Sequence, residues 1–391
     1  MPVPDVARTL SSPTGMSLPA RVLVADDQAD VLEAVRLLLR RSGLEGDFVT
    51  SPTAVLDRLR DQPYELLLLD LNYTRDTTSG GEGLELLQRI RQIDPVLPVV
   101  VMTGWGTIDT AVEAMRRGAR SFVQKPWDNT ALLDLLRREI DDARAVRQRD
   151  ARAQREEEDA RMIQRSLLPQ SLPAITPFSL GAHWRPASGY GGDWYDVSAL
   201  GSEVVGVAIA DVAGKGLPAA LLMSNLQAAV RAFWHPEAPP QQLCESVNRL
   251  LCRHMVNGRF VTFCAVRLDC RTRALTWANA GHNPPLVVRT SGAVVRLQPG
   301  GTVMGVFEDA AYREESIPLE PGDRIVLYTD GITEALSATG EEFGEEGLLA
   351  AINAHAGAGA AALTEKIFSD VLAFAGGTLG DDATLIAVAV E

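Results

Sequence analysis

The chain has 391 residues, more than one hydrophobic core usually serves, so two or three folding units are expected. With 46% hydrophobic and 23% charged residues, it is neither disordered nor membrane-embedded for most of its length. A formal net charge of -14 and the lack of a dense basic patch make nucleic acid and anionic membranes poor partners.

Residues 1–19 carry scattered prolines and polar groups but no apolar leader, so we expect a flexible arm on a cytoplasmic protein. The longest apolar run, residues 66–69, is too short to span a membrane and predicts a buried strand. The cysteines show no C-x-x-C spacing and are expected to be buried, reduced thiols. They are Cys244, Cys252, Cys264 and Cys270.

From residue 20 to about 131, β-rich runs alternate with amphipathic stretches, a pattern that predicts an α/β domain with a doubly wound, parallel, five-stranded sheet. The predicted strands cover residues 22–25, 47–50, 66–71, 98–102 and 121–124. Polar residues close or follow four of these strands at their carboxyl ends, where open parallel sheets place their active sites. They are Asp26, Asp27, Asp70, Thr103 and Lys125.

Three crowded carboxylates repel one another unless a divalent cation lies between them, and oxygen ligands suit Mg²⁺. Asp70 is then the candidate nucleophile, which accepts a phosphoryl group as an acyl phosphate. Lys125 is expected to pair with the added charge, and the Thr103 hydroxyl to hydrogen-bond a phosphoryl oxygen.

This constellation resembles the receiver domains of two-component response regulators. The resemblance implies a cognate histidine kinase and one Mg²⁺ held by Asp26, Asp27 and Asp70, with a further contact from the backbone carbonyl of Asn72. The loop over residues 72–81 is longer and more polar than usual, as in receivers of the nitrogen-regulator kind. Phe122 is either the aromatic residue that moves with the threonine in such domains or an ordinary core residue.

Residues 132–167 contain neither Pro nor Gly and predict one long, largely exposed helix that ends before Pro169. An apolar seven-residue ladder within it favours a dimerising coiled coil and hence a homodimer, although polar residues interrupt the pattern. The ladder is Val146, Ala153, Ala160 and Leu167, interrupted at Asp150, Glu157 and Gln164. The alternative is a solvated spacer stabilised by i,i+4 charge pairs.

The stretch 168–391 changes to many short strands with two helical segments, which predicts an α+β domain: a two-layered β-sandwich flanked by helices. Four aspartates follow or open its strands, each beside glycines that let the backbone approach a ligand. They are Asp193, Asp211, Asp330 and Asp381. Such oxygen donors build a cage for a hard cation without histidine or cysteine.

These motifs, in this order, resemble the PPM family of metal-dependent Ser/Thr phosphatases, in the bacterial branch that regulates sigma-factor partner switching and sporulation. Two further family motifs match, IQRSLLP at residues 163–169 and NAGHNPP at 279–285. The resemblance implies a phosphoserine or phosphothreonine protein as substrate, with an anti-sigma-factor antagonist as the expected one.

The same resemblance implies two Mn²⁺ or Mg²⁺ ions, which activate a bridging water for in-line attack on phosphorus. Asp211 is the expected bridge, joined by the Val212 carbonyl, and Asp330 and Asp381 complete the second ion's shell. Asp193 is expected to act nearby through water. Asp382 is a candidate for a supporting role, and Asp196 is a weaker candidate.

The sequence leaves several alternatives to an active phosphatase. A catalytically silent adaptor that binds a regulatory partner through the same fold is the main one. A transcription regulator predicts a basic helix-turn-helix, which the C-terminal half lacks. A dinucleotide cyclase is disfavoured because Trp194 and Tyr195 break its motif after Gly-Gly-Asp. A thiolate phosphatase is disfavoured as well, because no cysteine lies in the His-Cys-(five residues)-Arg loop that such an enzyme needs. His282 is either a proton donor to the leaving group or part of a structural turn before two prolines.

Overall fold

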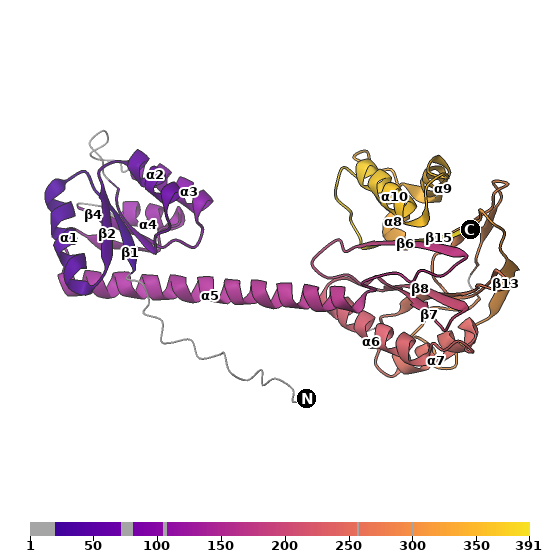
Figure 1. Cartoon of the computed structure of the whole chain (residues 1–391). Coiled ribbons are helices and arrows are strands. Elements are labelled where there is room, and N and C mark those ends of the chain that lie inside the picture. Colours follow the sequence, from indigo (N-terminus) through magenta and orange to yellow (C-terminus); the bar gives the residue numbers. More distant parts are fainter. Residues whose placement is uncertain (1–19, 72–80, 105–107, 256–257, 299) are drawn as a thin grey trace, which may run out of the picture. The chain divides into compact units, whose positions relative to one another are not determined.

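The computed structural model describes residues 20–71, 81–104, 108–255, 258–298 and 300–391 (Figure 1). The chain separates into two compact units, Met1–Gln154 and Arg155–Glu391. Among the described residues, no helix is long and apolar enough to cross a membrane.

The first unit is a five-stranded sheet in which every neighbouring pair is parallel, in the order β2-β1-β3-β4-β5. Its strands are β1 (Arg21–Ala25), β2 (Glu45–Val49), β3 (Leu66–Asp70), β4 (Val99–Thr103) and β5 (Ser121–Gln124). Its helices are α1 (Ala29–Ser42), α2 (Pro52–Asp61), α3 (Gly81–Ile93), α4 (Ile108–Arg116) and the start of α5 (Asn129–Leu167). The predicted doubly wound receiver fold is confirmed.

Strand β3 shows why its leucine run forms the centre of this sheet. Leu66 and Leu68 pack into one apolar cluster with residues of α1 and α5, while Leu67 and Leu69 pack into another with residues of α2 and α3. Side chains alternate between the two faces of a strand, so a strand covered by helices on both sides is apolar throughout. This burial fixes Asp70 at the carboxyl end of the sheet.

Helix α5 begins at Asn129, slightly earlier than predicted, and its first turns belong to the core of the first unit. Leu132, Leu136 and Ile140, spaced four residues apart, are buried against β1, β3 and α1. From residue 148 to residue 163 the helix is largely exposed. The helix therefore begins packed in the core and continues exposed to solvent. The predicted boundary between the receiver domain and the linker, at residues 131/132, remains a prediction.

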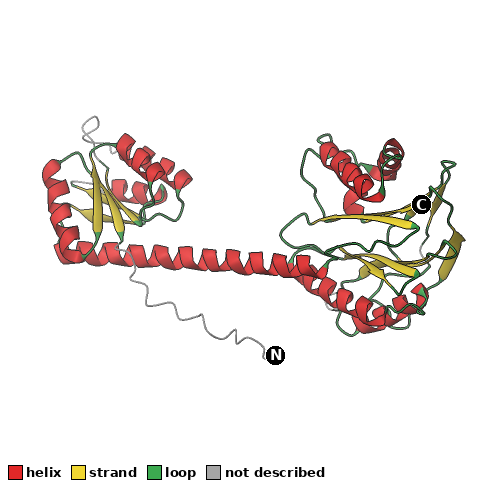
Figure 2. Ribbon diagram, in the orientation of Figure 1, coloured by secondary structure: helices red, strands yellow, loops and turns green. Residues whose placement is uncertain are grey.

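The second unit contains two antiparallel five-stranded sheets, in the orders β13-β10-β9-β8-β7 and β12-β11-β14-β15-β6 (Figure 2). The strands are β6 (Phe178–Arg185), β7 (Trp194–Ala199), β8 (Val204–Val212), β9 (Val261–Asp269), β10 (Ala274–Ala280), β11 (Leu286–Val288), β12 (Val294–Arg296), β13 (Glu314–Pro318), β14 (Arg324–Tyr328) and β15 (Ala383–Val390). The helices are α6 (Leu217–Phe233), α7 (Pro240–Cys252), α8 (Asp330–Thr333), α9 (Gly344–Ala354) and α10 (Ala360–Phe374).

The two sheets stack face to face, with α6 and α7 outside one and α8, α9 and α10 outside the other (Figure 1). In β14, Ile325 and Leu327 pack into the core between the sheets, whereas Val326 and Tyr328 pack against the outer helices. This alternation of period two confirms the predicted helix-flanked sandwich.

The cysteines all lie in this unit and all are free thiols. Cys244 and Cys264 are buried, as expected. The expectation is wrong for Cys252 and Cys270, which are only half-buried.

Candidate functional site

The first unit brings three acids together at the carboxyl ends of its strands. Asp26, Asp27 and Asp70 each offer a carboxylate oxygen, and these oxygens lie within 4.8 Å of one another. Among the described residues, this is the one group of three or more such side chains so close. The Nζ of Lys125 lies 2.6 Å from Asp26 and 3.3 Å from Asp70, so one ammonium partly offsets three acids.

Three other residues were predicted to belong to the receiver site: Thr103, Phe122 and Asn72. Thr103 is buried at the end of β4, and its carbonyl accepts a 2.7 Å hydrogen bond from the backbone N–H of Lys125. Phe122 is 50% exposed on β5, so the alternative that it belongs to the core is wrong. Asn72 lies outside the described residues.

In the second unit the four predicted aspartates converge from four separate segments. Asp193 immediately precedes β7, Asp211 lies near the end of β8, Asp330 follows β14, and Asp381 lies just before β15. Burial, and next the charges of Asp330 and Asp381, together raise the pKa of Asp211 to about 7. Strand ends from both sheets thus bring these acids near enough for their charges to interact, while the only three acids that all lie within 4.8 Å of one another among the described residues are those of the receiver.

Asp193 is the most deeply buried of these acids, with a side chain that leaves one oxygen without a partner. Its Oδ2 accepts hydrogen bonds from the hydroxyls of Thr329 and Thr384, each at 2.6 Å. Its Oδ1 is buried and has no hydrogen-bond partner. Burial, and next the charge of Asp211, raise the pKa of Asp193 well above its ordinary value. Buried polar atoms usually have a hydrogen-bond partner, so this unpaired carboxylate oxygen is available to bind an ion or a water molecule.

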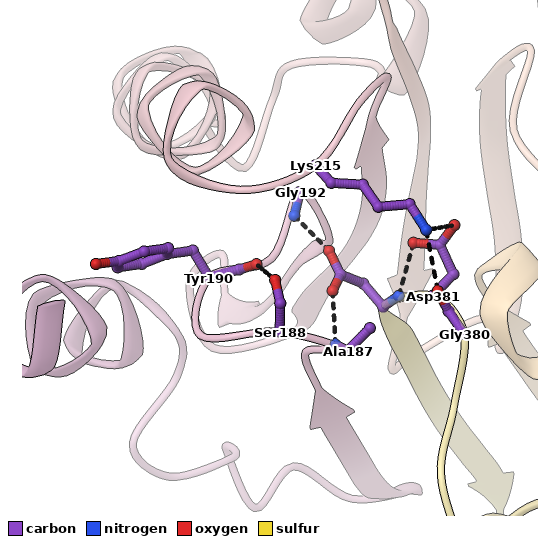
Figure 3. A network of polar contacts seen from close by, with 8 residues as sticks. Ala187, Ser188, Tyr190, Gly192, Lys215, Gly380 and Asp381 are labelled. Carbon is purple, nitrogen blue, oxygen red and sulfur yellow. Dashed lines mark hydrogen bonds and ion pairs between the residues drawn. The ribbon is translucent and has the colours of Figure 1, made fainter. Parts of the chain in front are cut away.

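Asp382 has a clear supporting role, because it holds the loop before Asp193. Its two oxygens accept hydrogen bonds from the backbone N–H groups of Ala187, at 2.8 Å, and Gly192, at 2.6 Å (Figure 3). Gln164, near the end of α5, also holds this loop. Its amide accepts from the N–H of Gly191 at 3.1 Å and donates to the carbonyl of Gly191 at 2.6 Å.

Close backbone contacts complete the site. The carbonyl oxygen of Val212 lies against Gly192, where an added Cβ would meet it at 2.8 Å. At Gly331 an added Cβ would lie only 1.9 Å from the carbonyl oxygen of Asp382, so this position requires glycine. The glycine after Asp330 is what lets the two acid-bearing turns touch.

Lys215 and Glu334 are charged neighbours that the sequence did not single out. The Nζ of Lys215 lies 3.1 Å from Asp381 and donates to the carbonyl of Gly380 at 2.9 Å (Figure 3). The hydrogen bond to Asp381 raises the pKa of Lys215. Glu334 adds negative charge, which raises the pKa values of Asp211 and Asp330.

Two other candidates do not belong to the acidic site. Asp196 is buried but pairs with Arg231 at 3.1 Å and accepts from the hydroxyl of Ser198 at 3.0 Å. His282 is 2% exposed, its Nδ1 lies 2.8 Å from the Thr262 hydroxyl, and burial lowers its pKa to about 4. The side chain of Asn279 bonds both the N–H and the carbonyl of His282. These contacts support the structural-turn interpretation of His282.

The fold and the two acidic sites define a class of protein: a response regulator whose output domain has a phosphatase-type fold. Residues 22–137 match the model of the response regulator receiver domain, and residues 201–391 match that of the Stage II sporulation protein E family. The chain belongs to this family of PPM-type phosphatase domains, in a form that carries an N-terminal receiver domain. The alternative of a DNA-binding output domain is therefore wrong.

Individual relatives agree with this assignment. The chain is 32% identical to the phosphoserine phosphatase RsbU of Bacillus subtilis, over 59% of this chain and 68% of that protein. It is 30% identical to protein IcfG of a Synechocystis species, where the match covers 59% of this chain but only 41% of the relative. The SiaA-PP2C domain of Pseudomonas aeruginosa shares the fold, with a TM-score of 0.56 and 22% identity over 62% of this chain and 98% of that domain.

Proposed function

We propose that this chain is a metal-dependent protein serine/threonine phosphatase whose activity is controlled by phosphorylation of Asp70. The observation that carries the proposal is the convergence of acids around Asp211, together with the buried, unpartnered oxygen of Asp193. These donors are all oxygens, which fits Mn²⁺ or Mg²⁺ rather than a softer metal. The 32% identity to a phosphoserine phosphatase supports the substrate class.

Five groups are assigned to hold two cations: the carboxylates of Asp193, Asp211, Asp330 and Asp381, and the carbonyl of Val212. Bound there, the cations supply an activated water and neutralise the phosphoryl oxygens. The remaining residues set the geometry. The hydroxyls of Thr329 and Thr384 hold the Asp193 side chain, and Asp382 holds the loop before it. The donor atoms therefore need little rearrangement when the cations bind.

The receiver is proposed to be the input domain, which is phosphorylated and controls the phosphatase. Asp26, Asp27 and Asp70, with the carbonyl of Asn72, would hold a Mg²⁺, and the Asp70 carboxylate would take a phosphoryl group from the phosphohistidine of a cognate kinase. Lys125 already contacts Asp26 and Asp70 and is placed to pair with the added charge. The expected output substrate is a phosphorylated anti-sigma-factor antagonist, and the exposed part of α5 is the expected contact of a homodimer.

The test is hydrolysis of p-nitrophenyl phosphate and of a phosphoserine protein by the full chain with Mn²⁺. Asp211→Asn and Asp330→Ala are expected to abolish turnover. Asp370→Asn serves as the matched control, because Asp370 on α10 pairs with His355 rather than with the site acids. Undiminished turnover in the two site variants overturns the assignment, and a wild-type chain that hydrolyses neither substrate points to a silent adaptor.

A further inference from the structure

The chain uses lysine sparingly and in particular places. It has 37 basic residues, of which only three are lysines: Lys125, Lys215 and Lys366. Lys125 lies in the receiver's acid pocket and Lys215 at the acidic site of the second unit. Arginine suits surface and bidentate ion pairs, whereas lysine offers a compact ammonium with three donors. At both places lysine supplies a compact positive charge on a flexible side chain.

The backbone presents Lys215 to the acids. It lies between Gly214, with φ +103°, and Gly216, with φ +74°, in the turn from β8 to α6. Side chains rarely tolerate positive φ, so the glycines on both sides set this turn. Lys215 thereby lies four residues after Asp211, and its side chain reaches Asp381, just before a strand of the opposite sheet.

Stability does not account for this contact. The side chain of Lys215 is 63% exposed and that of Asp381 is 42% exposed. Exposed ion pairs contribute little to stability and cost side-chain entropy. Among the described residues, Lys215 is nevertheless the one basic side chain in an ion pair with the site acids.

We propose that Lys215 binds the phosphoryl group of the substrate, and that it pairs with Asp381 only until that carboxylate turns to a cation. The inference rests on the proposed phosphatase function and adds the residue that recognises the phosphate dianion. The exposed ammonium lies at the rim of the acids, where the phosphate of a folded protein can reach it. Charge-assisted hydrogen bonds to phosphate oxygens then replace the pair with Asp381.

The experiment compares Lys215→Gln and Lys215→Arg in the full chain, with Lys366→Gln on α10 as the control. The readouts are KM and kcat for a phosphoserine peptide, inhibition by inorganic phosphate, and Mn²⁺ binding by calorimetry. For Lys215→Gln we expect KM and the inhibition constant of phosphate to rise about tenfold or more, with a smaller change in kcat. Mn²⁺ binding is expected to persist or tighten, because the competing ammonium is gone. Lys215→Arg should recover part of the loss, and Lys366→Gln should match the wild type.

Unchanged KM and phosphate inhibition in Lys215→Gln overturn the proposal, including the case in which only Mn²⁺ affinity rises. Stoichiometric Mn²⁺ binding by the variant shows that it has folded. If the wild type hydrolyses no substrate, the proposed function has failed instead. Phosphate binding to the Mn²⁺-loaded wild type and to Lys215→Gln, measured by calorimetry, then still decides whether Lys215 holds phosphate.

Discussion

At the scale of single residues, Asp211 shows what it costs to bury an acid among other acids without a neutralising charge. Burial and its acidic neighbours raise its pKa from 3.8 to about 7. The folded state therefore binds this proton more tightly than the unfolded chain does. Each unit of such a shift corresponds to about 1.4 kcal/mol of linked free energy.

The first prediction follows for the pH dependence of stability without metal. Because the pKa is raised on folding, stability should fall as pH rises from about 4 and level off above about 7. Mn²⁺ should remove the repulsion, so its stabilising effect should be larger at pH 8 than at pH 5. Thermal unfolding in EDTA and in Mn²⁺ across this range measures both effects.

Asp211→Asn is the matched variant for that prediction. In EDTA at pH 8 it should unfold at a higher temperature than the wild type, by about 2 kcal/mol in stability, and its pH dependence should be weaker. Mn²⁺ should no longer stabilise it strongly. A variant less stable than the wild type in EDTA at pH 8 contradicts the electrostatic account.

A second prediction concerns Gly331, where the turn of Asp330 meets the backbone of Asp382. A Cβ at 1.9 Å from a carbonyl oxygen forces the two turns apart, so Gly331→Ala should destabilise the domain by about 1–3 kcal/mol and abolish turnover. Gly357→Ala is the control, since nothing lies within 4 Å of an added Cβ there. Unfolding midpoints and p-nitrophenyl phosphate hydrolysis report the difference.

At the scale of elements, the end of α5 is tied to the loop that carries Asp193. Gln164 is 3% exposed and makes two hydrogen bonds to the backbone of Gly191. Gln164→Leu keeps the size but leaves a buried N–H and carbonyl unpaired, a cost of about 1–3 kcal/mol. The third prediction is faster amide exchange over residues 186–193 and reduced turnover.

Ser166→Ala is the control for this third prediction, because the exposed Ser166 bonds only the carbonyl of Ile163 within its own helix. It should behave like the wild type. If amide exchange over residues 186–193 is equal in Gln164→Leu and the wild type, the hydrogen bonds between Gln164 and Gly191 do not order the site.

The elements also show what sequence can and cannot predict. The acids of both sites were found because parallel and antiparallel strands end in recognisable patterns of apolar runs followed by aspartate and glycine. Thr329 and Thr384 were missed, since their bonds to Asp193 span 136 and 191 residues. Lys215 lies only four residues after Asp211, but its contact with Asp381 depends on how the two sheets stack, which the sequence does not show. The sequence left two interpretations of Phe122 open, because the side chain of a residue on an edge strand such as β5 can point either to the core or to solvent.

At the scale of the whole molecule, α5 is a continuous helix that starts in the core of the first unit and ends at a loop of the second. The fourth prediction is that a beryllofluoride adduct at Asp70 changes the phosphatase rate or the oligomeric mass. Replacing residues 152–155 with a Gly-Ser stretch should remove that response while Mn²⁺-dependent hydrolysis remains. Turnover and light scattering, with Asp70→Asn as the unresponsive control, test it.

The scarcity of lysine has a practical consequence for following this protein at work. An amine-specific reagent can modify only three side chains besides the terminal amine, and Lys215 is 63% exposed whereas Lys125 is 15% exposed. Covalent labelling read peptide by peptide in a mass spectrometer therefore reports on each acidic site separately. Protection of one peptide by phosphate and of the other by beryllofluoride lets input and output be observed in the same sample.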